Sequence, residues 1–361
     1  MVGMTLGRYL AWRFLKVILT IFSAIFCLLF VVDFVQLLRR AADHPDASAG
    51  VVALMSMMSV PHSSERALPF AVLGGAMWTF VDLTRKLELV VARAAGVSVW
   101  QFLTPPLLAV FMLGVASVTL YNPVSAVLRQ RYDQMEFQLF GVEGSLRIDH
   151  GVWLAQHGAD GLAILHALGA VGGGAELRSV TVYVSAPEGG FAEFIEAERA
   201  LLQPGAWLLQ KARVLSRGEP ATEVGEYLLA TDLSAEQLGA ATAPASRAPF
   251  WSLPDLAASI EDAGFDSRPY RLQFQKLLAR PLLLVAMLLV AAASSLRFFR
   301  FGGVAKALAG GVAAGFVLYI AAEIFSDLGG SGAIGPTLAA WTPALIGSML
   351  GTLSLLHSED G

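Results

Sequence analysis

Long apolar runs without charge are the feature that most constrains the fold of this chain. The run from Val17 to Val32 carries no charged residue and is bounded by Lys16 and Asp33. A helix needs about 20 mostly apolar residues to cross the hydrocarbon core of a bilayer. With Leu15 and residues 34–38 the run reaches this length, so we expect a transmembrane helix here.

Further apolar runs predict five more spans. Residues 47–81 are uncharged apart from Glu65 and Arg66, and the part after this pair is too short to span alone, so we interpret the run as one long helix kinked around Pro61. The second half of residues 94–128 supplies a third helix. The last three predicted spans are residues 281–296, 307–322 and 328–356. The chain is thus predicted to be an α-helical membrane protein with six transmembrane helices.

Composition agrees with a membrane protein and excludes several other classes. Only 15% of the residues are charged, whereas about 25% is usual in soluble domains. The net charge of −4 argues against a nucleic-acid partner. The one cysteine, Cys27, lies inside an apolar run, which excludes a disulfide framework and a paired-cysteine metal site. The first apolar run lacks a small-residue cleavage site, so we expect it to be retained as a helix.

Between the third and fourth predicted spans the sequence changes to a pattern typical of β structure. Val180, Val182 and Val184 alternate with other residues, and turn signals occur at Pro187 to Gly190 and again at Gln203 to Gly205. The run "LRIDHGVWLAQ" predicts an earlier hairpin, and "SLPDLAASIEDAG" predicts a short helix leading back to the membrane. We therefore expect residues 129–268 to form an all-β, jelly-roll-like domain, inserted between helical segments 1–128 and 269–361.

The distribution of basic residues predicts the orientation in the membrane. Cytoplasmic loops carry an excess of Lys and Arg. If the N-terminus is cytoplasmic, the short inside segments hold Arg8, Arg13, Lys16, Arg85, Lys86, Arg93, Arg297, Arg300 and Lys306. The first loop on the other side holds only Arg39, Arg40 and Arg66. The bias predicts that both termini are cytoplasmic and that the β domain lies outside.

The sequence shows no catalytic or nucleotide-binding motif of its own. There is no P-loop, no HExxH and no GxSxG, and the histidines of the β domain lack metal-ligand spacing. Asp33 and Glu323 are the acids that an intramembrane hydrolase or glycosyltransferase could use, and pairing with a neighbouring helix is their alternative role. A second alternative is a scaffold that transports nothing.

The stretch "LELVVARAAGVS" predicts a short helix over residues 86–97, between the second and third spans. Glu88, Val91 and Ala95 fall along one stripe of this helix. It is either a helix lying on the bilayer surface or a coupling helix that docks on a partner ATPase. In the second interpretation Glu88 and Arg93 fix the register, and Ala95 and Gly96 allow close approach.

Two arginines close the first span in the run "DFVQLLRR". Arg39 and Arg40 can extend to phospholipid headgroups, as basic side chains at helix ends do. Alternatively, their guanidinium groups bind the phosphates of an anionic lipid. Asp33 lies below them in the span, where a charge is costly, so we expect it to face protein or a cavity.

Together these runs resemble one known family over nearly the whole chain. The resemblance rests on "LGRYLAWRFL", "FVDFVQLLRR", "SVPHSSERALPFAVLGGAM", "RKLELVVARAAGVS", "GVWLAQ", "YRLQFQKLLARPLLLVAMLLVAAASSL" and "GFVLYIAAEIFSDLG". These resemble the LptF/LptG permeases, which export lipopolysaccharide across the envelope of Gram-negative bacteria. The end of the first helix resembles the G-type subunit more than the F-type subunit, which stays as the alternative.

The resemblance implies a fold and a set of partners. It implies six transmembrane helices with a periplasmic β-jelly roll between the third and fourth, in the inner membrane. It also implies three kinds of partner: an LptF-type permease, an LptC-type single-span protein and an LptB-type ATPase dimer. The ATPase binds ATP and Mg, and the coupling helix docks on it. The implied role is a permease subunit of an ABC transporter, not an enzyme and without a cofactor, that extracts lipopolysaccharide and passes it to a periplasmic bridge.

The resemblance also implies residues that contact lipopolysaccharide. Helices one and five line its cavity, and the lipid phosphates contact Arg39, Arg40, His62, Arg129 and Arg131 in this numbering. This chain departs from the family at two positions: it has Asp33 in place of a lysine and His62 in place of a basic residue. These departures make Arg39, Arg40, Arg129 and Arg131 the more important expected contacts.

Overall fold

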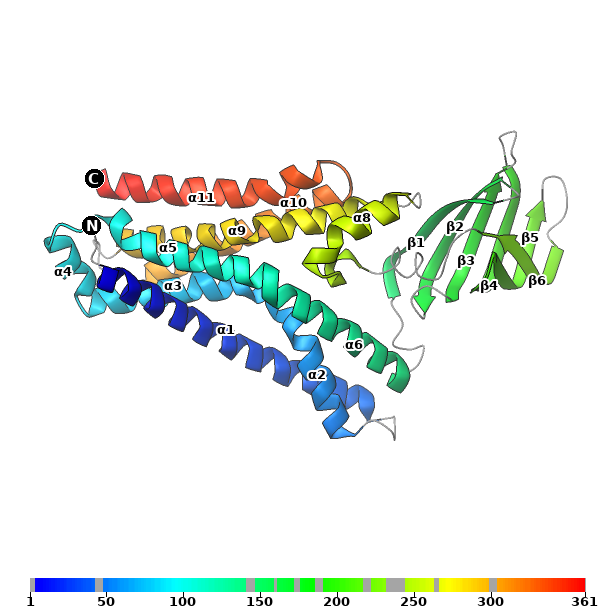
Figure 1. Cartoon of the computed structure of the whole chain (residues 1–361), viewed down its shortest axis with the longest axis horizontal. Helices are drawn as coiled ribbons and strands as arrows, with labels where there is room; N and C mark the ends of the chain where they lie inside the picture. Colours follow the sequence, from blue (N-terminus) through cyan, green and yellow to red (C-terminus); the bar gives the residue numbers. More distant parts are fainter. Residues whose placement is uncertain are drawn as a thin grey trace. The chain divides into compact units, whose positions relative to one another are not determined.

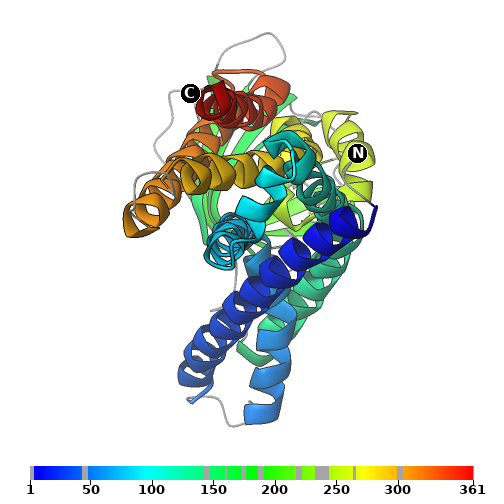
Figure 2. The same cartoon turned by 90° about the vertical axis from the view of Figure 1, so that its left-hand side faces the viewer.

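A computed structural model describes residues 4–42, 48–140, 147–158, 161–171, 176–185, 191–216, 222–231, 244–262, 266–298 and 304–360 (Figures 1 and 2). Within these residues, six helical stretches are long and apolar enough to cross a membrane, as predicted. The chain divides into a helical unit, which holds most of the length of these spans, and a second unit. The second unit holds the β-sheet, the last residues of span three and the first residues of span four.

The first two spans are long helices joined by a short loop. Span one is α1 (Met4–Ala41). Span two consists of α2 (Ala49–Ser64), a 3₁₀ turn η1 (Glu65–Ala67) and α3 (Leu68–Arg85), which follow one another without a break. The predicted single, irregular helix is confirmed, and its irregularity begins one turn after Pro61. Proline has no N–H to donate to the helix, so the backbone is weakened near this residue.

Span three is longer than the sequence pattern predicts. It consists of α5 (Val99–Ala116), a π-helical turn η2 (Ser117–Tyr121) and α6 (Asn122–Phe140). It begins at Val99 because Ser98 and Gln101 form a reciprocal capping box. Its charged end beyond Leu128 interrupts the apolar run but not the helix, so residues 129–140 are helical and not part of the sheet. The prediction that only the second half of residues 94–128 forms the span is therefore wrong.

The last three spans are α9 (Arg268–Phe298), α10 (Val304–Gly330) and α11 (Pro336–Asp360). Small residues let helices approach closely, as is usual in membranes. A Cβ added to Gly114 of α5 would lie 2.5 Å from Pro281 Cα of α9, so glycine is required at this crossing. On the other side of the core, Phe14 of α1 meets Phe80 of α3 edge-on, with 5.0 Å between ring centroids.

The second unit contains one antiparallel sheet. Its six described strands are β1 (Arg147–Gly158), β2 (Gly161–Val171), β3 (Glu176–Ser185), β4 (Phe191–Gln203), β5 (Ala206–Ser216) and β6 (Thr222–Ala230). Each strand pairs with its neighbour in sequence. The inserted all-β domain is confirmed, and the described strands follow a meander rather than the Greek-key order of a classical jelly roll.

Two local predictions for this unit have different outcomes. The turn at Gln203 to Gly205 is confirmed, because β4 ends at Gln203 and Gly205 adopts a φ of 82°, which suits glycine. The predicted hairpin in "LRIDHGVWLAQ" is wrong: the described residues of this run, 147–156, belong to the single strand β1, and Gly161–Val171 supplies its partner strand. The predicted turn at Pro187 to Gly190 lies outside the described residues. The predicted short helix is present as α8 (Leu253–Asp262).

One face of the sheet forms an apolar core. The fully buried side chains on this face include Leu165, Val182, Ile195 and Trp207. On each strand, the side chains directly before and after a buried one face the opposite side of the sheet. This period-2 pattern is the alternation expected for a half-buried sheet.

Candidate coupling and lipid-contact sites

The predicted helix between spans two and three is present as α4 (Glu88–Ala94). Leu87, with a φ of 59°, turns the chain out of α3, and Gly96, with a φ of 83°, turns it towards α5. Both residues lie in the left-handed region, which changes the chain direction abruptly. Leu89 is 7% exposed and packs into the core of the helical unit. In Figure 1, α4 lies at the end of this unit where α1 begins and α11 ends.

An arginine of the first span holds α4 in place. Arg13 Nη1 donates to Glu88 Oε2 at 2.8 Å and to Oε1 at 2.9 Å, and Arg13 Nη2 pairs with Asp82 of α3. Tyr9 Oη also donates to Glu88, at 3.2 Å, and the Arg13 guanidinium lies over the Tyr9 ring. We call these four residues, Tyr9, Arg13, Asp82 and Glu88, the arginine clamp. The clamp connects span one, span two and α4.

The outer face of α4 is exposed and largely apolar. Val90 is 52% exposed and Val91 66%, and Arg93 and Ala95 are exposed as well. A water-facing helix of seven residues gains nothing from exposing two valines. The face is therefore suited to contact with another protein.

The predicted coupling residues thus separate into two groups. Glu88 is bound within the chain by the arginine clamp, whereas Val91, Arg93, Ala95 and Gly96 are exposed. The sequence pattern missed Arg13, because a basic residue at a helix end is ordinarily taken as a headgroup contact. Arg13 lies one helical turn after Tyr9, and this spacing is the sequence signal that could have indicated a hydrogen-bonded site at Arg13.

The predicted lipid-contact residues do not form one cluster. Arg129 of α6 donates to Ser59 Oγ of α2 at 3.1 Å, and its guanidinium lies 4.5 Å from the centre of the Tyr132 ring. Asp33 of α1 lies within electrostatic reach of Arg129 and next to Ser56. His62 is half-buried one turn beyond Ser59 on the same helix. Asp33 of span one and Arg129 of span three thus lie within electrostatic reach of each other, each beside a serine of span two.

The other predicted contacts lie apart from this cluster. Arg39 and Arg40 are exposed at the end of α1, and Arg131 is exposed on α6. Exposed guanidinium groups at the ends of spans are able to reach lipid phosphates.

A buried ion pair that the sequence pattern missed connects three spans. Glu65, in the 3₁₀ turn of span two, is 6% exposed, and Arg280 Nη1 of α9 donates to its Oε2 at 2.8 Å. Asn122 Nδ2 donates to both Glu65 oxygens at 3.2 Å, and Ser125 donates as well. A buried charge is tolerated when it is paired and hydrogen-bonded in this way.

A second group of charges lies near the C-terminal end of α10. Lys276 of α9 donates to Ser326 Oγ of α10 at 2.7 Å and lies within electrostatic reach of Glu323. Glu323 also lies next to Tyr319. The two acids that an intramembrane enzyme could use thus each lie within electrostatic reach of a different base, Glu323 of Lys276 and Asp33 of Arg129.

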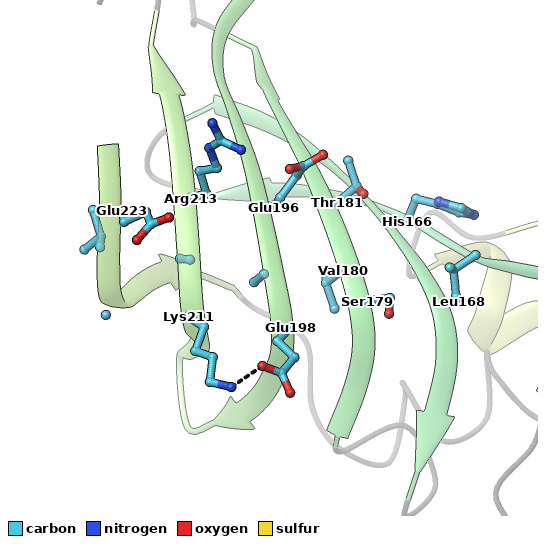
Figure 3. A pocket seen from close by; sticks show the side chains of 14 residues that line it. His166, Leu168, Ser179, Val180, Thr181, Glu196, Glu198, Lys211, Arg213 and Glu223 are labelled. Carbon is cyan, nitrogen blue, oxygen red and sulfur yellow. Dashed lines mark hydrogen bonds and ion pairs between the residues drawn. The ribbon is translucent and has the colours of Figure 1, made fainter. Parts of the chain in front are cut away.

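The outer face of the sheet carries a polar groove of about 1000 Å³ (Figure 3). His166, Thr181, Glu196, Arg213 and Glu223 lie opposite one another on successive strands and form its main row. Beside them Lys211 pairs with Glu198 and lowers the pKa of that carboxyl group. Charges of both signs alternate across the row, which is the arrangement of a solvated, cross-strand paired surface.

Few side chains in the apolar segments of spans one and five are fully buried within the chain, whereas span two is largely buried. On α10, the residues Phe316, Ile320, Glu323 and Asp327 recur every three or four positions, so they share one exposed face. Charged residues within a span ordinarily face protein or an aqueous cavity, so this face is suited to a partner or a cavity.

Six spans, a β domain inserted after the third and an exposed short helix between the second and third define a multi-pass membrane permease. The chain matches the family of the lipopolysaccharide export system permeases LptF/LptG over residues 8–357, and it belongs to this family. The family is not catalytic, and the chain is a permease component of a lipopolysaccharide exporter.

Two curated relatives carry the name of the G-type subunit. The lipopolysaccharide export system permease protein LptG of Escherichia coli strain K12 is 23% identical over 352 residues, which cover 93% of each chain. The protein of the same name from Escherichia coli O6:H1 matches with the same identity and coverage. The resemblance noted from the sequence motifs is thus confirmed at the level of the family.

Proposed function

We propose that this chain is the G-type permease subunit, which extracts lipopolysaccharide from the inner membrane and passes it to a periplasmic bridge. It works with an LptF-type permease and an LptC-type single-span protein. ATP and Mg are bound by a separate LptB-type ATPase dimer, which docks on α4. The names of the relatives support the G-type assignment.

The observation that carries the proposal is the arginine clamp on α4. A rod that transmits force needs a free face for the motor and a rigid connection to the spans. Val91 and its neighbours supply the free face, and Glu88 connects the rod to span one through Arg13. Because Asp82 binds the same guanidinium, a movement of α4 reaches spans one and two together.

The orientation of the chain in the membrane is inferred from the end of the helical unit that carries α4. The start of α1, the end of α11 and α4 lie together there (Figure 1), along with the basic residues Arg13, Arg85 and Lys86. We propose that this end is cytoplasmic, as the positive-inside rule requires. The β unit is then periplasmic.

The bare faces of spans one and five support a role in lipid handling. Exposing an acyl chain to water costs about 0.8 kcal/mol per CH₂ group, so extraction needs a protected apolar path. The exposed faces of spans one and five, together with the second permease subunit, provide this protected path. We propose that Arg39, Arg40 and Arg131 contact the lipid phosphates, with Arg129 and His62 at the deeper position.

The docking and transmission roles of α4 are tested with two variants. Val91→Asp places a charge on the exposed face, and we expect it to reduce co-purification of the ATPase by about tenfold, with Val91→Ile as the matched control. Arg13→Gln leaves that face intact. We expect it to retain the ATPase but to lower lipopolysaccharide-stimulated ATP hydrolysis. Full recovery of the ATPase with Val91→Asp would contradict docking at α4.

A further inference from the structure

The segment between the sheet and α8 returns briefly to the helical unit. Ala248–Trp251 belong to this unit, whereas the residues on both sides of them, Asp133–Arg247 and Ser252–Tyr270, belong to the second unit. We call Ala248–Trp251 the strap. Phe250 anchors it, because its side chain is 8% exposed and its ring stacks on Phe274 of α9, with 5.2 Å between centroids. The strap contains none of the proposed coupling or lipid-contact residues.

The strap binds span three at its π-helical turn, Ser117–Tyr121. Trp251 Nε1 donates to Thr119 O, inside the turn, at 3.3 Å. Phe250 N donates to Asn122 Oδ1, directly after the turn, at 3.0 Å. Two neighbouring residues of the strap therefore hold one point within the turn and one point beyond it.

The turn is a joint at which span three can change register. A π-helical turn contains about one residue more than an α-helical turn, and such turns are frequent at functional sites. Rewinding it into α-helix would rotate the helix beyond it by about 100° and move it by about 1.5 Å, the values for one residue. Asn122 would then turn away from the strap, while Thr119 would turn much less. The two strap contacts are thus compatible with the π-helical register alone.

A further contact holds the same register. Arg247, directly before the strap, pairs through Nη1 with Asp133 Oδ2 near the end of α6, at 2.6 Å. Asp133 also lies beyond the turn, so rewinding would rotate it away from Arg247. The return segment therefore contacts span three within the turn, directly after it and near its end.

The side chain of Asn122 connects the strap to the buried ion pair. Asn122 is 2% exposed; its Oδ1 accepts from the strap, and its Nδ2 donates to both Glu65 oxygens at 3.2 Å. A buried acceptor that loses its donor is costly. Release of the strap would leave Oδ1 without the Phe250 donor and so destabilise this position of Asn122. The strap and the turn are therefore expected to change together.

The register of the turn also determines where Arg129 points. Arg129 lies beyond the turn, where it donates to Ser59 Oγ at 3.1 Å and is within electrostatic reach of Asp33. A rotation of about 100° would remove the guanidinium from Ser59. The position of this base thus depends on whether the strap is attached.

We infer that the strap is a latch that sets the register of span three beyond its π-helical turn, and with it the direction of Arg129. The latched state is the one described here. Because both ends of the strap continue into the second unit, movement of that unit acts on the latch directly. The latch is a two-state element of the kind that conformational switching requires. It does not require docking at α4, because all its contacts lie within the chain.

Hydrogen–deuterium exchange of the Phe250 amide reports the state of the latch. The purified exporter complex is compared without nucleotide and after trapping with ATP and vanadate. Exchange requires opening of the strap, so we expect it to be about tenfold faster in one state than in the other. Equal exchange in both states would overturn the inference, whatever the outcome for any variant.

Two matched tryptophan variants test the contact itself. Trp251→Phe keeps a ring but removes the donor to Thr119, and should accelerate exchange at Phe250 by roughly fivefold, the factor of one ordinary hydrogen bond. Trp341→Phe removes a similar donor, which binds Gln275 Oε1 at 3.0 Å, and should leave exchange at Phe250 unchanged. Equal exchange in these two variants would contradict the role of the strap.

Deletion of Leu120 tests the joint. Leu120 is 68% exposed, and its deletion removes the extra residue of the turn, so both flanks stay in the latched register. We expect wild-type elution and co-purification of the ATPase but about tenfold less lipopolysaccharide export. Leu120→Ala keeps the residue count and should export normally. Normal export by the deletion variant would overturn the inference, whereas a failure of docking at α4 would appear in Val91→Asp.

Discussion

At the scale of single residues, Asp33 determines how much positive charge the first three spans present to a lipid. Its carboxylate lies near Arg129, whose guanidinium also contacts Ser59 and the Tyr132 ring. A lipid phosphate that binds Arg129 must compete with this acid. We propose Arg39 and Arg40, which are exposed at the end of α1, as the other contacts for the phosphate.

This competition predicts the effect of neutralising the acid. In Asp33→Asn, Arg129 loses the opposing carboxylate, and we expect photo-crosslinking of lipopolysaccharide to this region to rise by roughly fivefold, or about 1 kcal/mol. Crosslinking is measured with a photoreactive residue at position 36 of the first span. Asp262→Asn on α8 makes the same chemical change outside the spans and should have no effect. Unchanged or reduced crosslinking in Asp33→Asn would contradict the competition.

At the scale of helices, the ion pair of Glu65 and Arg280 stabilises two departures from regular α-helix. These are the 3₁₀ turn of span two and the π-helical turn of span three. Glu65 lies in the 3₁₀ turn, and its partner Asn122 directly follows the π-helical turn. Asn122 Oδ1 also accepts from Phe250 N at 3.0 Å, and Trp251 Nε1 donates to Thr119 O at 3.3 Å. The segment at Phe250 thereby forms hydrogen bonds to residues in and directly after the π-helical turn.

This arrangement predicts non-additive effects on stability. Arg280→Met leaves the Glu65 carboxylate buried without its countercharge and should reduce the free energy of unfolding by about 3 kcal/mol. Adding Glu65→Gln removes that charge, so the double variant should recover most of the loss. Unfolding in detergent is followed by thermal denaturation of the purified complex.

The exposed pair of Lys211 and Glu198 provides the control for this cycle. Its side chains are largely solvated, so Lys211→Met should not measurably change unfolding. A double variant at Glu65 and Arg280 that is less stable than Arg280→Met would contradict the role of the buried pair.

At the scale of the whole molecule, the helical unit is incomplete by itself. Span two is largely buried, but few side chains in the apolar segments of spans one and five are fully buried. On span five the uncovered face also includes Glu323 and Asp327. Such a face is costly in contact with lipid alone, so we expect a second permease subunit to cover it.

A photoreactive residue at Ile320 tests this expectation. It lies on the face shared by Glu323 and Asp327, so irradiation should crosslink it to a second permease subunit, detected as a higher-mass band. Met349 on span six is at least as exposed and serves as the control, for which we expect adducts with lipid only. A band of equal strength from both positions would show that span five is not a preferred interface.

The sequence by itself determined the number of spans, the inserted β domain and the family, because these depend on hydropathy, period-2 alternation and motif order, which are local. It also located the exposed helix α4 and the arginines at the end of span one. The tertiary structure decided which charges are paired. Arg13 pairs with Glu88, and Arg280 pairs with Glu65. The residues of each pair are separated by many positions in the sequence, so no local pattern relates them. Burial of a charge in a membrane protein requires a partner from another helix, and only the packing of the helices reveals that partner.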